Sequence, residues 1–313
     1  MLNRMLTIEI ARVTEAAAIA AARCQGRGDE RQADRAAVDA MRQALNSVAE
    51  MDGLVVIGEG ERDEVPMLYI GEKVGGGKSW RIDVALDPLE GATLCAKAMP
   101  GAISCVAMAE GGALLHPPCR YMDKIAIGGG YSEGLVDLDF PPEENLARLA
   151  RAKDVPTSRI TACILDRPRH ADLIAAVRKT GASIRLISDG DVAGVIHTGD
   201  AKETGIDIYL GIGGAPEGVL AAAALRCIGG QMQGRLVADT ARRGGGKTAG
   251  QKYTLTELAS GDVMFAATGV TDGSLLQGVR FERSHVMTET VVMRSATGTV
   301  RWIRTRRMDE TNA

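Results

Sequence analysis

The stretch IDIYLGIGGAPEGVLAAAALRCI, residues 206–228, joins a strand pattern to a helix pattern through a glycine-rich turn. Its apolar first part predicts a strand over Ile206–Ile212, and its alanine-rich second part predicts a helix over Gly218–Ile228. Two earlier strand–helix pairs have the same order: 160–165 with 170–180, and 183–187 with 192–197. Strands that alternate with helices indicate βαβ units, so we expect a largely parallel sheet in this part of the chain.

The residues before this alternation predict a mixture of helices and strands. Apolar spacing predicts one helix around residues 16–22 and a second around residues 38–48. Further apolar runs predict strands over 54–57, 82–86 and 124–127, and an antiparallel hairpin made of 102–109 and 113–116.

The segment Asp139–Pro156 has three prolines and mixed charges, and it is the predicted boundary between two halves. We therefore expect an α+β half over residues 1–155 and an α/β half over residues 156–313. The remaining predicted elements of the second half are a strand over 263–267, a closing hairpin of 286–293 with 299–303, and a loop, ARRGGGKTAGQ, over 241–251.

Composition excludes several classes of protein. The 313 residues are 45% hydrophobic and 25% charged, with a formal charge of −3, which argues against disorder and against binding nucleic acid through bulk charge. Aromatic residues make up 3%, too few for base-stacking platforms. No apolar run is long enough to span a membrane, and Arg4, Glu9 and Arg12 interrupt any secretory signal. Six scattered cysteines predict reduced, buried thiols. We expect a cytoplasmic protein.

Acidic residues directly follow two predicted buried strands. Leu54–Ile57 runs into GEGERDE, and Ile82–Leu86 runs into DPLEG. Carboxylates at strand ends of an α/β protein face the crevice where ligands bind, and converging carboxylates require a hard cation such as Mg²⁺ or Mn²⁺ to offset their repulsion. Each segment taken alone is more often a solvated acidic turn, but two of them after two apolar strands favour a metal site.

Glycine turns and arginines follow the strands of the second half. Asp189-Gly190-Asp191 and GGAPEG, residues 213–218, each link a predicted strand to a helix, where free backbone N–H groups bind anions. Arg167-Pro168-Arg169-His170 lies at another such junction, where guanidinium groups bind phosphate. The alternatives are ordinary turn chemistry with Asp as a helix cap, and a solvated arginine pair.

These segments together resemble the class II fructose-1,6-bisphosphatases of bacteria, within the superfamily of lithium-sensitive, metal-dependent phosphatases. The similarity runs over nearly the whole chain and is most specific in IGEGERDEVPMLYIGEKVG, residues 57–75. Other matching segments are GRGD with Asp34, DPLEG, YMDK from Tyr121, RPRH, DGD, GIGGAPEG and ATG from Ala267. The resemblance implies a layered α-β-α-β-α sandwich of two halves, as in sugar phosphatases, and metal-dependent removal of the 1-phosphate of fructose 1,6-bisphosphate.

The resemblance also implies roles for particular residues. The metal ligands would be Asp34, Glu59, Asp87, Glu90 and Glu217, which would hold Mg²⁺ or Mn²⁺. The sugar-phosphate contacts would be Glu90, Gly91, Tyr121, Arg167, Pro168, Arg169, Asp189, Gly190, Asp191 and Gly214. The catalytic positions would be Glu90, Glu61 as a supporting group or substitute base, and position 92.

This chain departs from the family pattern at three places. The threonine that directly follows DPxEG in the family, and helps to deprotonate the attacking water, is Ala92 here. A positioned proton-transfer group contributes about 10²–10⁴ in rate, so impaired turnover is expected. A family lysine in the GRGDK element is Glu30, and the chain between Asp239 and Lys252 is expected to be shorter than in many relatives.

We therefore expect a fructose-bisphosphatase of gluconeogenesis or the Calvin cycle that forms a homo-oligomer, a dimer or tetramer, and binds a sugar bisphosphate, without nucleic acid or membrane partners. Sedoheptulose 1,7-bisphosphate is an alternative substrate. Two other functions remain open: a phosphatase of the same superfamily acting on another sugar or inositol phosphate, and a sugar-phosphate-binding protein without catalysis.

Overall fold

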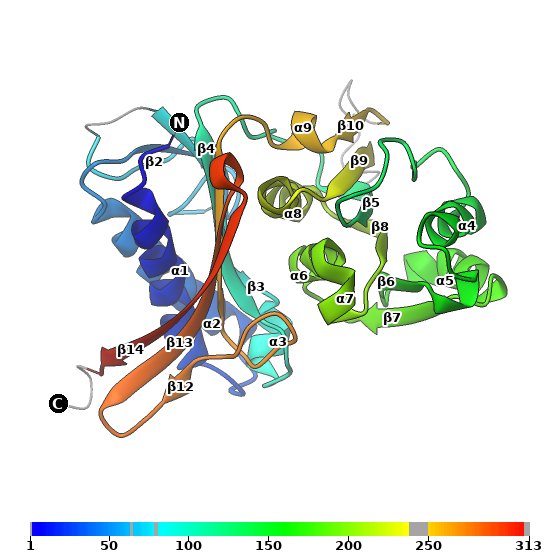
Figure 1. Cartoon of the computed structure of the whole chain (residues 1–313). Helices are drawn as coiled ribbons and strands as arrows, with labels where there is room; N and C mark the ends of the chain where they lie inside the picture. Colours follow the sequence, from blue (N-terminus) through cyan, green and yellow to red (C-terminus); the bar gives the residue numbers. More distant parts are fainter. Residues whose placement is uncertain (1, 63–64, 78–80, 238–249, 310–313) are drawn as a thin grey trace. The chain divides into compact units, whose positions relative to one another are not determined.

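The computed structural model describes residues 2–62, 65–77, 81–237 and 250–309 (Figure 1). The chain forms two compact units: unit 1 contains Met1–Leu114 and Ser260–Ala313, and unit 2 contains Leu115–Ala259. The predicted division between residues 155 and 156 does not coincide with these units, because the last strands of the chain pair with strands from its first third. Asp63, Glu64 and most of the predicted loop 241–251 lie outside the described residues.

Unit 1 contains a mixed sheet with the strand order β12-β13-β11-β4-β3-β1-β2, and β14 pairs with β13. β1 and β3 are parallel, and the other pairs are antiparallel. The strands are β1 (Asp52–Ile57), β2 (Lys73–Val74), β3 (Arg81–Glu90), β4 (Ile103–Glu110), β11 (Val263–Gly269), β12 (Arg280–Phe281), β13 (His285–Arg294) and β14 (Thr299–Met308).

Two sequence predictions for unit 1 are wrong. The strand predicted over 113–116 does not form, and β4 pairs instead with β3 and β11 on its two sides. β11 was expected in the sheet of the second half, but it belongs to unit 1. Both errors arise because every residue of β4 except Glu110 is buried, so the strand pairs on both sides, with β3 and with β11, which is distant in sequence. The predicted closing hairpin, β13 with β14, is confirmed.

The helices of unit 1 are α1 (Leu6–Ala22), α2 (Glu30–Asn46) and α3 (Ala92–Ala96). α1 begins ten residues before the predicted run because Leu6, Ile10 and Val13 continue its buried face. α1 packs on β4, β11 and β13, and α2 packs on α1, α3 and β3. Asp29 caps α2 by accepting a hydrogen bond of 3.0 Å from the Gln32 N–H.

Unit 2 contains a six-stranded mixed sheet with the order β10-β9-β5-β8-β6-β7. The pairs β6–β7 and β6–β8 are parallel, as the βαβ pattern predicts, but β5 is antiparallel to both β8 and β9, so the sheet is only partly parallel. The strands are β5 (Tyr121–Ile127), β6 (Thr161–Leu165), β7 (Ser183–Ile187), β8 (Ile208–Gly214), β9 (Gln231–Val237) and β10 (Lys252–Thr254).

The helices of unit 2 pack in two groups, α4 with α5 and α6 with α8. Leu146 and Leu149 of α4 and Val177 of α5 share a hydrophobic core with the sheet, while α8 packs on α6 and on β5, β8 and β9. The predicted boundary segment 139–156 is therefore mostly a core helix. The helices are α4 (Pro142–Ala152), α5 (Ala171–Lys179), α6 (Asp191–Ile196), α7 (Ala201–Thr204), α8 (Ala215–Ile228) and α9 (Leu255–Leu258).

The two units confirm the predicted α/β class, since each combines a mixed sheet with helices. Four single-turn 3-10 helices complete the described elements: η1 (Thr157–Arg159), η2 (Pro168–His170), η3 (His197–Asp200) and η4 (Ser295–Thr297). The six cysteines are buried thiols, as predicted. Within the described ranges, no helix is long and apolar enough to cross a lipid bilayer.

Candidate functional site

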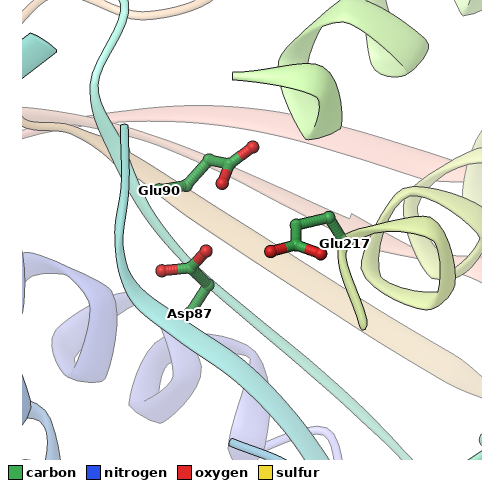
Figure 2. Close-up of side chains that lie close together, drawn as sticks. All are labelled: Asp87, Glu90 and Glu217. Carbon is green, nitrogen blue, oxygen red and sulfur yellow. The ribbon is translucent and has the colours of Figure 1, made fainter. Parts of the chain in front are cut away.

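The end of β3 in unit 1 carries two of the predicted metal ligands, Asp87 and Glu90. The pairing of β3 with β4 shifts register between these residues, so that they do not alternate as in a regular strand. Their carboxylate oxygens lie within 4.8 Å of each other (Figure 2). Asp87 Oδ1 accepts a hydrogen bond of 3.0 Å from the Leu89 N–H, and Glu90 is only 6% exposed. Two carboxylates this close repel each other unless a cation lies near them.

Glu59 lies beside this strand end. β1 runs parallel to β3, with Ile57 opposite Ala85. Glu59, two residues past Ile57, therefore follows β1 at the same edge of the sheet as Asp87, two residues past Ala85. The Glu59 N–H donates a hydrogen bond of 3.0 Å to the Leu68 carbonyl, which fixes the backbone after β1. Glu61 is exposed.

Asp34, another predicted metal ligand, lies on a helix of unit 1. It lies on α2, which packs against both α3 and β3, and it is partly buried. Burial raises the pKa of the Asp34 carboxyl, because the charged form loses hydration. A bound cation would offset that loss.

Position 92 lies at the first turn of α3. Gly91 caps this helix with φ 87°, a left-handed conformation that favours glycine, and the half-buried Ala92 is its first residue. The other end of α3 is held by the GRGD segment, since the N–H groups of Gly26 and Gly28 donate to the carbonyls of Cys95 and Ala96 at 3.0 and 2.9 Å. The departure at Ala92 thus stands directly after the carboxylates of β3.

The predicted sugar-phosphate residues of unit 2 gather at one edge of its sheet. Arg167 and Pro168 follow β6, Asp189–Asp191 follow β7, and Gly214 ends β8 opposite Tyr121 on β5. The Arg167 guanidinium lies 3.9 Å from Asp189 Oδ1, and the guanidinium of Arg169 lies 5.7 Å from the centre of the Tyr121 ring. These contacts show that unit 2 alone brings most of the set together.

Arg169 and His170 hold the backbone of Ile212. Arg169 donates two hydrogen bonds to the Ile212 carbonyl, at 3.0 and 2.8 Å, and the Ile212 N–H donates to His170 Nε2 at 2.8 Å. Because Nε2 accepts, Nδ1 carries the proton, and it donates to the Leu165 carbonyl at 2.7 Å. The RPRH motif marks this junction in the sequence, but it does not indicate that His170 stabilises it.

Lys124, the last residue of the YMDK segment, has a place in unit 2 that the motif alone does not indicate. It is 1% exposed, forms an ion pair with Asp191 and donates a hydrogen bond of 2.9 Å to the Gly214 carbonyl. The Tyr209 hydroxyl donates to the same Asp191 oxygen at 3.4 Å. The available signal was a lysine within the apolar strand run MDKIAI.

Steric crowding explains why three positions of GIGGAPEG are glycine. A Cβ at Gly213 would overlap Asp191 Oδ2, and a Cβ at Gly214 would overlap the Glu217 carboxylate. At Gly218 it would meet Met122 Sδ at 2.7 Å and Lys124 Cδ at 3.3 Å. The glycines therefore make room for buried charged side chains.

Glu217 lies in the first turn of α8, after Pro216 (Figure 2). Burial, and then the nearby Asp191 carboxylate, raise the pKa of Glu217, while the Lys124 ammonium lowers it. Within the part of the chain that the structure describes, the buried Oε2 atom has no hydrogen-bond partner. An uncompensated buried carboxylate oxygen fits the chemistry of a hard-cation ligand.

Comparison with known proteins gives one consistent result. A family model described as bacterial fructose-1,6-bisphosphatase, glpX-encoded, matches residues 4–307. A D-fructose 1,6-bisphosphatase class 2/sedoheptulose 1,7-bisphosphatase of Synechococcus sp. (strain JA-3-3Ab) is 43% identical over 340 residues, 99% of this chain and 97% of the relative. The protein of the same name from Synechococcus elongatus (strain ATCC 33912 / PCC 7942 / FACHB-805) is 42% identical over 335 residues, 97% of this chain and 96% of the relative.

Proposed function

Because this chain belongs to the family of bacterial, glpX-encoded fructose-1,6-bisphosphatases, we propose that it hydrolyses fructose 1,6-bisphosphate to fructose 6-phosphate and inorganic phosphate. The observation that carries the proposal is the convergence of the Asp87 and Glu90 carboxylates at the irregular end of β3, immediately before the glycine-capped helix α3. In the reaction, a water oxygen bonds to phosphorus, the bond from phosphorus to the C1 oxygen breaks, and a proton passes to that leaving oxygen.

The proposed metal ligands are the five carboxylates Asp34, Glu59, Asp87, Glu90 and Glu217. Within unit 1, the Asp87 and Glu90 carboxylates lie close enough together to share a metal ion, and Glu217 of unit 2 is proposed as a further ligand. All donors are oxygen atoms, which favours Mg²⁺ or Mn²⁺. When bound, such a cation supplies polarisation of a phosphate oxygen and lowers the pKa of water. The raised pKa of Asp34 and the buried Oε2 of Glu217 support this donor set.

The proposed substrate contacts divide into groups that bind and groups that orient. Arg167, with 37% of its side chain exposed, is available for a phosphate. Arg169 already donates two hydrogen bonds to Ile212, so its main effect is to orient the end of β8. Tyr121, Asp189, Gly190, Asp191 and Gly214 would contact the sugar phosphate, together with Glu90 and Gly91 of unit 1.

Ala92 limits the proposed chemistry. Its methyl group cannot accept or donate a proton, so the attacking water lacks the hydroxyl that the family resemblance assigns to this position. Glu61 is the proposed substitute base. We expect turnover to be slower than in relatives with threonine by about 10²–10⁴-fold, the usual contribution of a positioned proton-transfer group.

The test is release of inorganic phosphate by the Ala92→Thr variant, assayed with Mg²⁺ or Mn²⁺ and with a chelator. Fructose 1,6-bisphosphate, sedoheptulose 1,7-bisphosphate and an inositol monophosphate are compared as substrates. We expect metal-dependent hydrolysis of a sugar bisphosphate in preference to the inositol ester. The absence of any hydrolysis by this variant with metal present would contradict the proposal.

Ala92 specifically favours a second candidate, a sugar-phosphate-binding protein without catalysis. Calorimetry distinguishes the two: metal-dependent binding of fructose 1,6-bisphosphate with no phosphate release in Ala92→Thr would support the second. The proposals of a homo-oligomer and of a cytoplasmic location follow from the family resemblance and the composition, and sedimentation and cell fractionation test them.

A further inference from the structure

We propose that Lys124 is a positioning residue that sets the geometry of the sugar-phosphate site within unit 2. The inference rests on the proposed function, because the residues that Lys124 contacts matter through their expected contacts with the substrate. Lys124 itself is buried on β5 and would not touch the substrate.

The contacts of Lys124 join two separate turns. Its ammonium pairs with Asp191, the first residue of α6, and donates at 2.9 Å to the carbonyl of Gly214, the N-cap of α8. α6 follows β7, and α8 follows β8. One side chain therefore ties together the turns that carry Asp189, Gly190, Asp191 and Gly214.

The surroundings of Lys124 are shaped for this pair. A buried ammonium loses its hydration, and only a carboxylate and hydrogen-bond acceptors can offset that loss. Gly213 leaves the space that Asp191 occupies, and Gly218 leaves space beside the Lys124 aliphatic chain. Tyr209 adds a hydrogen bond of 3.4 Å to Asp191 from the neighbouring strand β8. A substitution that enlarged the space around Lys124 would loosen the contacts that hold the Asp191 turn and the Gly214 turn together.

Lys153 provides a matched control in the same unit. It pairs with the buried Asp207, whose second oxygen accepts a hydrogen bond of 2.8 Å from the Thr161 N–H. Asp207 precedes the first residue of β8, whereas Gly214 is its last residue. The two lysine–aspartate pairs therefore lie at opposite ends of one strand, and only the pair at the carboxyl end contacts proposed substrate residues.

The experiment measures the Kd of fructose 1,6-bisphosphate by calorimetry, with Mg²⁺ or Mn²⁺, using the full chain with Ala92. The variants are Lys124→Met, Lys124→Gln, Lys124→Arg and the control Lys153→Met, and thermal unfolding is recorded for each. We expect Lys124→Met and Lys124→Gln to weaken binding roughly 10–100-fold, the size typical of lost outer-shell support. Lys124→Arg, which keeps the charge, should bind more tightly than either, and Lys153→Met should leave the Kd unchanged.

A Lys124→Met protein that is folded and binds as tightly as the unchanged chain would overturn the inference. It would also be overturned if Lys153→Met weakened binding equally, or if every Lys124 variant failed to fold, because the lysine would then have only a structural role. If the unchanged chain binds no fructose 1,6-bisphosphate, the proposed function fails first, before any variant is compared.

In the Ala92→Thr background, the same substitution at Lys124 separates KM from kcat. A misplaced binding turn weakens the substrate and transition-state complexes alike, so KM should rise while kcat changes much less. A fall in kcat as large as the fall in kcat/KM, with KM unchanged, would contradict a role in positioning the substrate.

Discussion

The strands β3 in unit 1 and β8 in unit 2 both run through a glycine into a helix, and both have carboxylates at that point. The two strand ends differ in how large a side chain the surrounding atoms can accommodate. At β3, the irregular pairing presents Asp87 and Glu90. Position 92, two residues past Glu90, accommodates alanine where the family resemblance gives threonine. At β8, a single added carbon at Gly213 would overlap the Asp191 carboxylate.

This difference separates two kinds of site residue. The proposed chemistry at β3 depends on a few polar atoms, so we expect a substitution at the half-buried Ala92 to change reactivity more than the fold. The end of β8 is close-packed around a buried ion pair, so a substitution there changes the packing first.

At the end of β3, restoring a hydroxyl at position 92 should raise kcat by about 10²–10⁴-fold, because the water would regain a group that positions its proton. Ala92→Thr and Ala92→Ser should both show the rise in a phosphate-release assay. Ala92→Val is the control, since it matches the shape of threonine without the hydroxyl. A rise in the valine variant as well would attribute the effect to packing rather than to proton transfer.

At the end of β8, Gly213→Ala should lower the free energy of unfolding by about 3 kcal/mol, the upper part of the range for overpacking. Gly229→Ala is the matched control in unit 2, because Gly229 has φ 76° but no atom within 4 Å of the added carbon. Its cost should be about 1–2 kcal/mol, from backbone strain alone. Urea unfolding of both variants decides whether crowding outweighs strain; equal losses would contradict the steric explanation.

His197, which follows α6, should make unit 2 sensitive to mild acid. Burial, and then the positive charge of Arg185, lower the pKa of His197 to about 4 in the folded protein, whereas about 6.5 is usual for an unfolded chain. As pH falls, His197 binds a proton in the unfolded state before it does so in the folded state. The contribution of neutral His197 to the free energy of unfolding is therefore fully present above pH 6.5 and is lost as pH falls towards 4. The total loss should be roughly 2–3 kcal/mol.

Unfolding measured from pH 7 to pH 4 checks this prediction, with His197→Gln as the comparison. The variant should lose less stability over that interval than the unchanged chain. Parallel pH profiles for the two proteins would show that another group is responsible.

At the start of β3, the buried Asp83 accepts hydrogen bonds from the N–H groups of Gly112 and Leu114, at 2.7 and 3.4 Å. Asp83→Asn keeps one acceptor oxygen and should cost only about 1 kcal/mol in the free energy of unfolding, the size of one ordinary hydrogen bond. Substrate binding should not change, because Asp83 is at the opposite end of β3 from Glu90. Weakened binding in this variant would show that the two ends of the strand are coupled.

Sequence patterns predicted the local elements well where a single segment carries the signal. The period of Val38, Met41 and Leu45 indicated α2, and the strand–helix order after residue 160 indicated β6, α5, β7, α6, β8 and α8. Patterns failed where partners are distant. β11 belongs to unit 1 because it pairs with β4, and nothing within Val263–Gly269 specifies that partner.

For the candidate site, the amino-acid order was enough to name the acidic strand ends, the glycine turns and the departure at Ala92, because each motif is a short run of adjacent residues. It could not reveal that Lys124 pairs with Asp191 or that Gly213 makes room for that pair. Those relations arise only when β5, β8 and α6 pack together, since burial and close contact depend on atoms that lie far apart along the chain.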